Sequence, residues 1–244
     1  MSNSPLVCYT KISPHKSVKR MHIIDTISIH CMAGNLTIEE CGELFQTELA
    51  SSQYGIGSDG RIAQYVDEDD RAWCTSSPSN DNRAITIEVA NNGGGPLWPV
   101  SDAAYESLIQ LLVDICKRNN IPKLLWRADK NLIGQVDKQN MTVHRWFAQK
   151  ACPGDFLYSH HADIAERVNA ILEGDELDMT EKELLDVAGT GDNPSSWAAK
   201  ATENMKNLGI VKGDGNGNFG WQKPITREAM AVMLNAIAEK MGLV

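Results

Sequence analysis

Three side chains that could bind a metal or move protons lie close together late in the sequence. His144, Lys150 and Cys152 all fall in the run Thr142–Asp155. His144 and Cys152 are eight residues apart, so they are not neighbours on one helix face, where contacts come every three or four residues. They can converge if a short helical turn after His144 gives way to a loop, because the Pro-Gly pair that follows Cys152 interrupts a helix. Imidazole and thiolate are both good zinc ligands, but a site needs a third.

The third ligand is expected from His30. Residues 23–30 end in an alternation that puts Ile27 and Ile29 on one face and polar side chains on the other, which predicts a strand. A histidine at the end of a strand lies where α/β proteins place their site residues. Two histidines and one cysteine leave the fourth tetrahedral position of zinc open, as in catalytic sites. Taken singly, His30 could instead be an ordinary polar residue and Cys152 a small buried one.

Five segments resemble the type-2 N-acetylmuramoyl-L-alanine amidases, whose fold is shared with phage lysozyme-type amidases and peptidoglycan recognition proteins. They occur in the family's order, and the resemblance spans about three fifths of the chain. The segments are residues 26–34, 51–66, 71–73, 82–89 and 144–154. The resemblance implies an α/β fold in which helices flank a central mixed β-sheet, with a small all-α domain after it. It also implies the substrate, peptidoglycan.

The resemblance also assigns roles to single residues. The zinc ligands of the family fall on His30, His144 and Cys152, so the implied cofactor is Zn²⁺. The catalytic lysine falls on Lys150 and the catalytic glutamate on Glu88.

The chemistry of amide hydrolysis is consistent with these roles. A nucleophile, a stabilised oxyanion and a proton for the leaving amine are needed, and zinc lowers the pKa of a bound water to about 7. The ammonium of Lys150 could stabilise the oxyanion, and Glu88, on a predicted strand at 84–90, could transfer the proton. Without the resemblance, Glu88 would be interpreted as a solvated charge and Lys150 as a lysine that offsets a helix dipole.

Two aromatic residues are further candidates. Some members of the superfamily place a tyrosine near the metal, from the segment that Tyr54 occupies here. Tyr54 therefore competes with Glu88 for the proton-transfer role, although a tyrosine beside a strand usually serves packing. Trp73 resembles a residue of the binding groove, where it could stack on sugar rings, and burial is the alternative.

Composition limits the classes of partner. The chain has 244 residues with a net charge of −9, which argues against binding nucleic acid through its phosphates. No run approaches the roughly 20 apolar residues of a membrane span. The six cysteines show no paired short spacing, which indicates reduced thiols. The first residues do not resemble a signal peptide. The expectation is synthesis in a host cytoplasm and action on the wall once the membrane is breached, as for a phage endolysin.

Helix signals complete the α/β pattern. Thr37 and Glu40 form a predicted capping box that opens a helix to about residue 50. A second helix is predicted from Ser101 to about residue 119, and a third over 156–172. The glycine-rich segment 91–99 lacks the lysine of a phosphate-binding loop and is predicted to border the groove.

The predicted domains are a zinc amidase domain over 1–174, a linker over 175–190 and a wall-binding or association domain over 191–244. The last resembles one S-layer homology repeat, a type of repeat that holds cell-wall polymers and usually occurs in sets of three. Its candidate wall-binding residues are Thr226, Arg227 and Glu228, although Ala229 replaces the family's usual acidic or amide residue. Self-association through this domain is the alternative role. A calcium loop at 214–218 is rejected, because the required glycine and glutamate are replaced.

The sequence therefore predicts a zinc-dependent amidase that cuts the bond between N-acetylmuramic acid and L-alanine, acting as a phage endolysin. The alternatives are a host autolysin and a non-catalytic peptidoglycan recognition module. The recognition modules of this fold lack the cysteine ligand, whereas Cys152 is present.

Overall fold

The computed structural model describes residues 3–187 and 199–209, together with 232, 234, 235, 237 and 238. The chain divides into two compact units, Met1–Asp178 and Met179–Val244. In the second unit, α5 (Ala199–Asn207) is a helix. The predicted wall-binding residues Thr226, Arg227 and Glu228 lie outside the described residues.

A mixed sheet forms the centre of the first unit, which confirms the prediction, and it has six strands. The order is β1-β5-β4-β7-β3-β8, and every described pair is parallel except β4 with β5. The strands are β1 (Tyr9–Thr10), β3 (Thr26–Cys31), β4 (Tyr54–Ile56), β5 (Ile62–Gln64), β7 (Ala84–Val89) and β8 (Met141–Thr142). A separate antiparallel pair joins β2 (Lys16–Ser17) to β6 (Arg71–Ala72).

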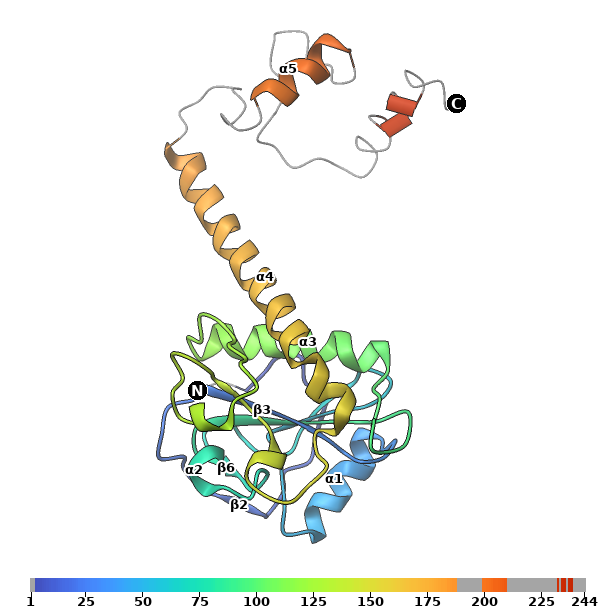
Figure 1. The fold of residues 1–244 in the computed structure, drawn as a ribbon, viewed down its shortest axis with the longest axis vertical. Coiled ribbons are helices and arrows are strands. Elements are labelled where there is room, and N and C mark those ends of the chain that lie inside the picture. The colour runs from blue at the N-terminus through green and yellow to red at the C-terminus, as the bar shows by residue number, and fades with distance from the viewer. Residues whose placement is uncertain (1–2, 188–198, 210–231, 233, 236, 239–244) are drawn as a thin grey trace. The chain divides into compact units, whose positions relative to one another are not determined.

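The two faces of the sheet carry different side chains. Ile27 and Ile29 of β3 are in register with Ile85 and Ile87 of β7, and all four are fully buried. They pack in one apolar cluster with α3 (Asp102–Arg118) and with the first part of α4 (Gly154–Val187). A second cluster packs α1 (Ile38–Thr47) over β5 on the opposite face (Figure 1). The polar residues of β3 and β7 therefore share the face away from α3.

Two helix starts follow their sequence signals. The Thr37 hydroxyl accepts from the Glu40 amide at 3.1 Å, and the Glu40 carboxylate accepts from the Thr37 amide at 2.8 Å, which confirms the capping box of α1. The Ser101 hydroxyl caps α3 by accepting from the Ala104 amide at 3.1 Å. The remaining short helices are α2 (Pro78–Asp81), η1 (Lys130–Leu132) and η2 (His144–Trp146).

Helix α4 differs from the sequence prediction. One continuous helix runs from Gly154 to Val187, where the sequence suggested a helix over 156–172, an acidic break and then a short helix. The predicted domain limits, with a linker at 175–190, stay a prediction. Within the described part of the chain, no helix combines the length and apolar character needed to cross a bilayer.

The glycine-rich segment 91–99 supports the start of α4. The carbonyls of Pro96 and Leu97 accept from the amides of Asp155 and Phe156 at 3.0 and 2.8 Å, so they satisfy amides that the first helical turn leaves unpaired. Gly154 is required at this contact. Its φ is +82°, and a Cβ there would lie 2.6 Å from the Cβ of Trp98. This segment therefore fixes the end of the loop that carries Cys152.

Candidate metal centre

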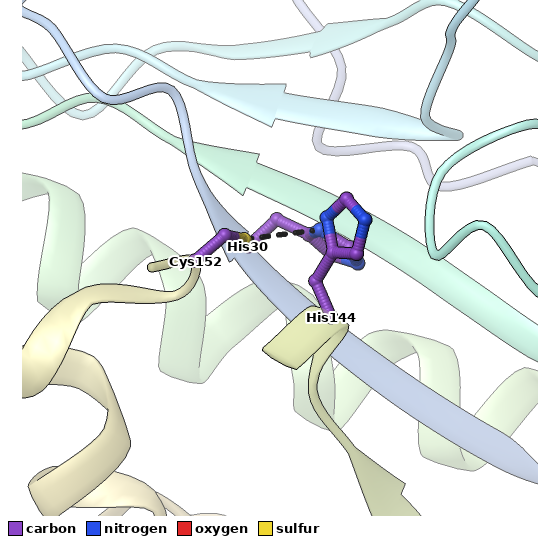
Figure 2. Close-up of side chains that lie close together, drawn as sticks. All are labelled: His30, His144 and Cys152. Carbon is purple, nitrogen blue, oxygen red and sulfur yellow. Dashed lines mark hydrogen bonds between the residues drawn. The ribbon is translucent and has the colours of Figure 1, made fainter. Parts of the chain in front are cut away.

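His30, His144 and Cys152 converge from three different elements (Figure 2). His30 is on β3, His144 begins η2, and Cys152 lies in the loop before α4. One ligand atom from each residue lies within 4.8 Å of the other two. Because the three donors are borderline-soft nitrogen and sulfur atoms, the cluster has the chemistry of a zinc site.

The turn predicted after His144 brings His144 and Cys152 together. The Phe147 amide donates to the His144 carbonyl at 2.9 Å, which forms the short helical turn. The chain then returns, so that the Arg145 amide donates to the Cys152 carbonyl at 3.2 Å. This backbone bond closes the loop and confirms the predicted turn-and-loop arrangement.

Burial favours the neutral form of both imidazoles. His30 is fully buried, and its Nδ1 lies 3.2 Å from the Cys152 Sγ. Burial lowers the pKa of His30 well below its usual value, and the neighbouring His144, whose ring centroid is 5.2 Å away, lowers it further. Burial also lowers the pKa of His144, with a further contribution from the charge of Lys150. Neutral imidazoles are the form that binds metals.

Glu88 lies beside the cluster because of strand pairing. The parallel register places it opposite His30, with a carboxylate oxygen 3.9 Å from His30 Nδ1. Its side chain is 15% exposed, and burial raises its pKa well above the usual glutamate value. Oε1 accepts from the Cys74 thiol at 3.8 Å, whereas the buried Oε2 has no hydrogen-bond partner among the described residues. The interpretation of Glu88 as a solvated strand charge does not fit this burial.

Lys150 is exposed and lies near the cluster. Its positive charge adds to the effect of burial in lowering the pKa of His144. Lys150 follows η2 in a loop, so a role in offsetting a helix dipole does not apply to it.

The structure does not bring Tyr54 to the cluster. Tyr54 is in register with Ile87, so its side chain lies on the face opposite His30 and Glu88. It is fully buried, and its hydroxyl donates at 2.5 Å to Glu68, whose carboxylate also binds Arg118 at 2.7 Å. The structure therefore places Tyr54 in a packing position away from the cluster, and this geometry does not support its expected catalytic role.

Trp73 is half-buried, with its indole Nε1 donating to the Ser17 hydroxyl at 3.0 Å. Its ring centroid lies 6.0 Å from that of His15. These contacts hold the side chain in place. The predicted contact of Trp73 with sugar rings stays a prediction.

Sequence reasoning did not identify the polar side chains around the cluster. Ser28 lies 3.3 Å from His30 Nε2, and Ser76 lies 3.1 Å from His144 Nε2. The alternation of the strand could have identified Ser28, since it precedes His30 by two residues and lies on the same face. No local sequence pattern indicated Ser76 or Cys74, because these residues reach the cluster only through the tertiary fold.

Two family models match parts of this chain. A family model described as N-acetylmuramoyl-L-alanine amidase matches residues 20–155, which is more than half of the chain. A second model, described as the S-layer homology domain, matches residues 192–231. The comparison with curated proteins found no match.

Solved structures with related folds include a selenomethionine AmpD derivative, with a TM-score of 0.51 and 19% identity, covering 67% of this chain and 96% of that one. The endolysin N-acetylmuramoyl-L-alanine amidase LysCS from Clostridium intestinale URNW has a TM-score of 0.45 and 21% identity, and the match covers 67% of this chain and 98% of that one. The Drosophila peptidoglycan recognition protein SD has a TM-score of 0.44 and 16% identity, and the match covers 60% of this chain and 85% of that one. The first of these likenesses shows the fold.

We expect Glu88→Gln to stabilise the metal-free protein at mildly alkaline pH by about 1 kcal/mol or more, because a buried carboxylate without a full set of partners is removed. Burial holds the pKa of Glu88 above its unfolded value, so the wild type loses stability as the pH rises between these two values. The advantage of the variant should therefore shrink as the pH falls through this window, and it should be smallest below about 4.3, the ordinary glutamate pKa.

Urea unfolding in the presence of a chelator measures this difference. Glu39→Gln is the matched control, because Glu39 lies on the surface, where its hydrogen bond with Arg61 lowers its pKa instead of raising it. A Glu88→Gln variant no more stable than wild type at alkaline pH would contradict the expectation.

Proposed function

Because the chain belongs to the N-acetylmuramoyl-L-alanine amidase family, we propose that it is a zinc-dependent enzyme that hydrolyses the amide bond between N-acetylmuramic acid and L-alanine in peptidoglycan. The observation that carries the zinc chemistry is the convergence of His30, His144 and Cys152, with ligand atoms within 4.8 Å of one another.

The residues of this cluster fit a catalytic zinc ion. Three protein ligands leave one tetrahedral position for water or substrate, whereas structural sites use four. The lowered pKa values of His30 and His144 keep both rings neutral, as ligation requires. The chemistry that zinc supplies in such a site is Lewis-acid activation of a water molecule and of the scissile carbonyl.

Glu88 is the group that moves the proton in this proposal. Its raised pKa brings the carboxyl closer to neutral pH, where a group that must both accept and donate a proton works best. Among the described residues the carboxyl accepts only from the Cys74 thiol, so it retains an oxygen to take the proton from the attacking water and pass it to the leaving nitrogen. Placement beside His30 keeps this transfer within the cluster.

Lys150 supplies positive charge in this proposal. Its exposed ammonium, close enough to affect His144, can approach the carbonyl oxygen as negative charge develops there. The site would then combine a buried acid–base group with a solvent-facing cation.

Cys152 favours the enzyme over the non-catalytic recognition module, because the thiol lies in hydrogen-bonding contact with His30. That the protein acts as a phage endolysin, and not as a host autolysin, stays a prediction.

The S-layer homology match supports a further proposal, that residues 191–244 hold the protein on a cell-wall polymer. Self-association through the same residues is also a prediction, which light scattering of the purified chain tests.

Cys152→Ser should weaken zinc binding by more than about 100-fold and abolish wall hydrolysis, since loss of an outer-shell partner alone costs 10–100-fold. Competition with a chromophoric chelator measures the affinity, and release of new amino groups from cell walls measures the activity. Cys8→Ser, which changes an exposed thiol outside the cluster, should match wild type in both. Full activity of a metal-free Cys152→Ser protein would refute the zinc chemistry.

Lys150→Ala should retain zinc but lose about 10²–10³ in kcat, the effect of removing one oxyanion-stabilising group. Glu88→Gln should retain zinc and lose about 10²–10⁴, as expected for a general acid–base group. Lys138→Ala is the control for charge, because Lys138 is exposed and its ammonium donates to Gln135. If either of the first two variants loses its zinc, the role assigned to that residue is wrong.

A chain that ends after Val187 keeps α4 whole and should hydrolyse soluble muropeptides at the wild-type rate. It should no longer sediment with intact cell walls, and lysis of whole cells should weaken. Sedimentation equal to that of the full chain would assign wall binding to the first unit.

A further inference from the structure

Each histidine of the cluster has one ring nitrogen held by a serine hydroxyl. His30 Nε2 lies 3.3 Å from Ser28 Oγ, and His144 Nε2 lies 3.1 Å from Ser76 Oγ. The other nitrogen of His30, Nδ1, faces the Cys152 Sγ at 3.2 Å. Figure 2 shows that the His144 ring also turns one nitrogen toward His30 and Cys152 and the other away from them.

A neutral imidazole can ligate a metal only through the nitrogen that lacks a proton, and the proton on the other nitrogen needs an acceptor. We propose that Ser28 and Ser76 are positioning residues that accept the Nε2–H of His30 and His144, so that both Nδ1 atoms present lone pairs to a metal. This inference rests on the proposed zinc chemistry and adds the groups that orient its ligands.

The hydrogen bonds around Ser28 fix its direction. A serine hydroxyl has one proton to donate. Ser28 donates it to the Thr142 carbonyl at 3.2 Å, so a lone pair remains for the His30 Nε2–H. The Thr142 hydroxyl is shared between Ser28 Oγ at 3.2 Å and Asn80 Oδ1 at 3.1 Å. All of these groups are buried, so water does not compete for the bonds.

Ser76 has an unusual backbone. Its φ is +64°, a left-handed conformation that is uncommon outside glycine and that tends to occur at functional sites. Glycine would adopt this φ without strain, but glycine has no hydroxyl to offer His144. The serine at this strained position is therefore explained by its side chain.

The neighbours of Ser76 hold that conformation. The buried Asp81 carboxylate accepts from the Cys74 amide at 3.2 Å, from the Thr75 amide at 3.0 Å and from the Thr75 hydroxyl at 2.6 Å. On the other side, the Ser77 amide donates to Thr75 Oγ1 at 3.3 Å. The loop is thus pinned on both sides of Ser76, and the Ser76 hydroxyl is left for His144.

Nitrogen-15 NMR of the histidine rings in the metal-free full-length protein tests the direction of these bonds. At a pH where both rings are neutral, His30 and His144 should each carry the proton on Nε2. Ser76→Ala should convert His144 to a mixture of tautomers and leave His30 unchanged. A proton on Nδ1 of His144 in the wild type, or no change in Ser76→Ala, would overturn the proposal.

Zinc affinity tests the consequence. Ser76→Ala and Ser76→Gly should each weaken zinc binding by about 10–100-fold, the usual effect of losing an outer-shell partner. Ser76→Gly also relieves the left-handed strain, so the metal-free variant should unfold at the same temperature as wild type or higher. Lower affinity without lower stability would exclude a purely structural role for the hydroxyl.

Ser79→Ala is the matched control, because exposed Ser79 contacts the Ser77 hydroxyl at 3.1 Å and no histidine. It should bind zinc as wild type does. Ser76→Gly with wild-type zinc affinity would overturn the inference and leave the proposed function intact. A wild-type protein that binds no zinc would instead overturn the proposed function itself.

Discussion

The parallel pairing of β3 with β7 is the constraint on which the candidate site depends. One register places His30 opposite Glu88 on one face and Ile29 opposite Ile87 on the other. Since successive side chains point to opposite faces, a slip of one residue would turn His30 into the apolar cluster beneath α3. The burial of the isoleucine pairs therefore also fixes the separation of the histidine and the carboxylate.

The rest of the site is held by loops whose backbones are pinned. Asp81 binds the backbone amides that precede Ser76, and the carbonyls of Pro96 and Leu97 bind the first amides of α4 behind Cys152. Preorganisation of this kind removes the need to order the chain at the moment of reaction.

Much of this architecture could be predicted from local patterns. Alternation predicted β3 and β7, the Thr37 capping box predicted α1, and the Pro-Gly pair predicted the turn that returns Cys152 to His144. The resemblance then selected the three residues that the fold brings together.

The misses have physical causes. Tyr54 lies on a three-residue strand that is buried on both faces, so alternation gives no direction for its side chain. Helix α4 runs through Gly174 although glycine costs about 1 kcal/mol in a helix, and a weak local penalty of this size does not reliably mark a break. Ser76 reaches His144 across 68 residues of sequence, a distance over which no local pattern operates.

The dispersion of the ligands along the chain has a thermodynamic consequence. His30 and Cys152 are 122 residues apart, and they meet only when β3, η2 and α4 are all in place. An unfolded chain cannot gather them without the full loop-closure entropy, so a metal ion would bind the folded state almost exclusively. The free energy of unfolding would therefore rise with metal concentration, roughly as the logarithm of the ratio of that concentration to the dissociation constant. A bound ion would therefore act as a cross-link that holds the ends of the sheet and the loops together for as long as it stays.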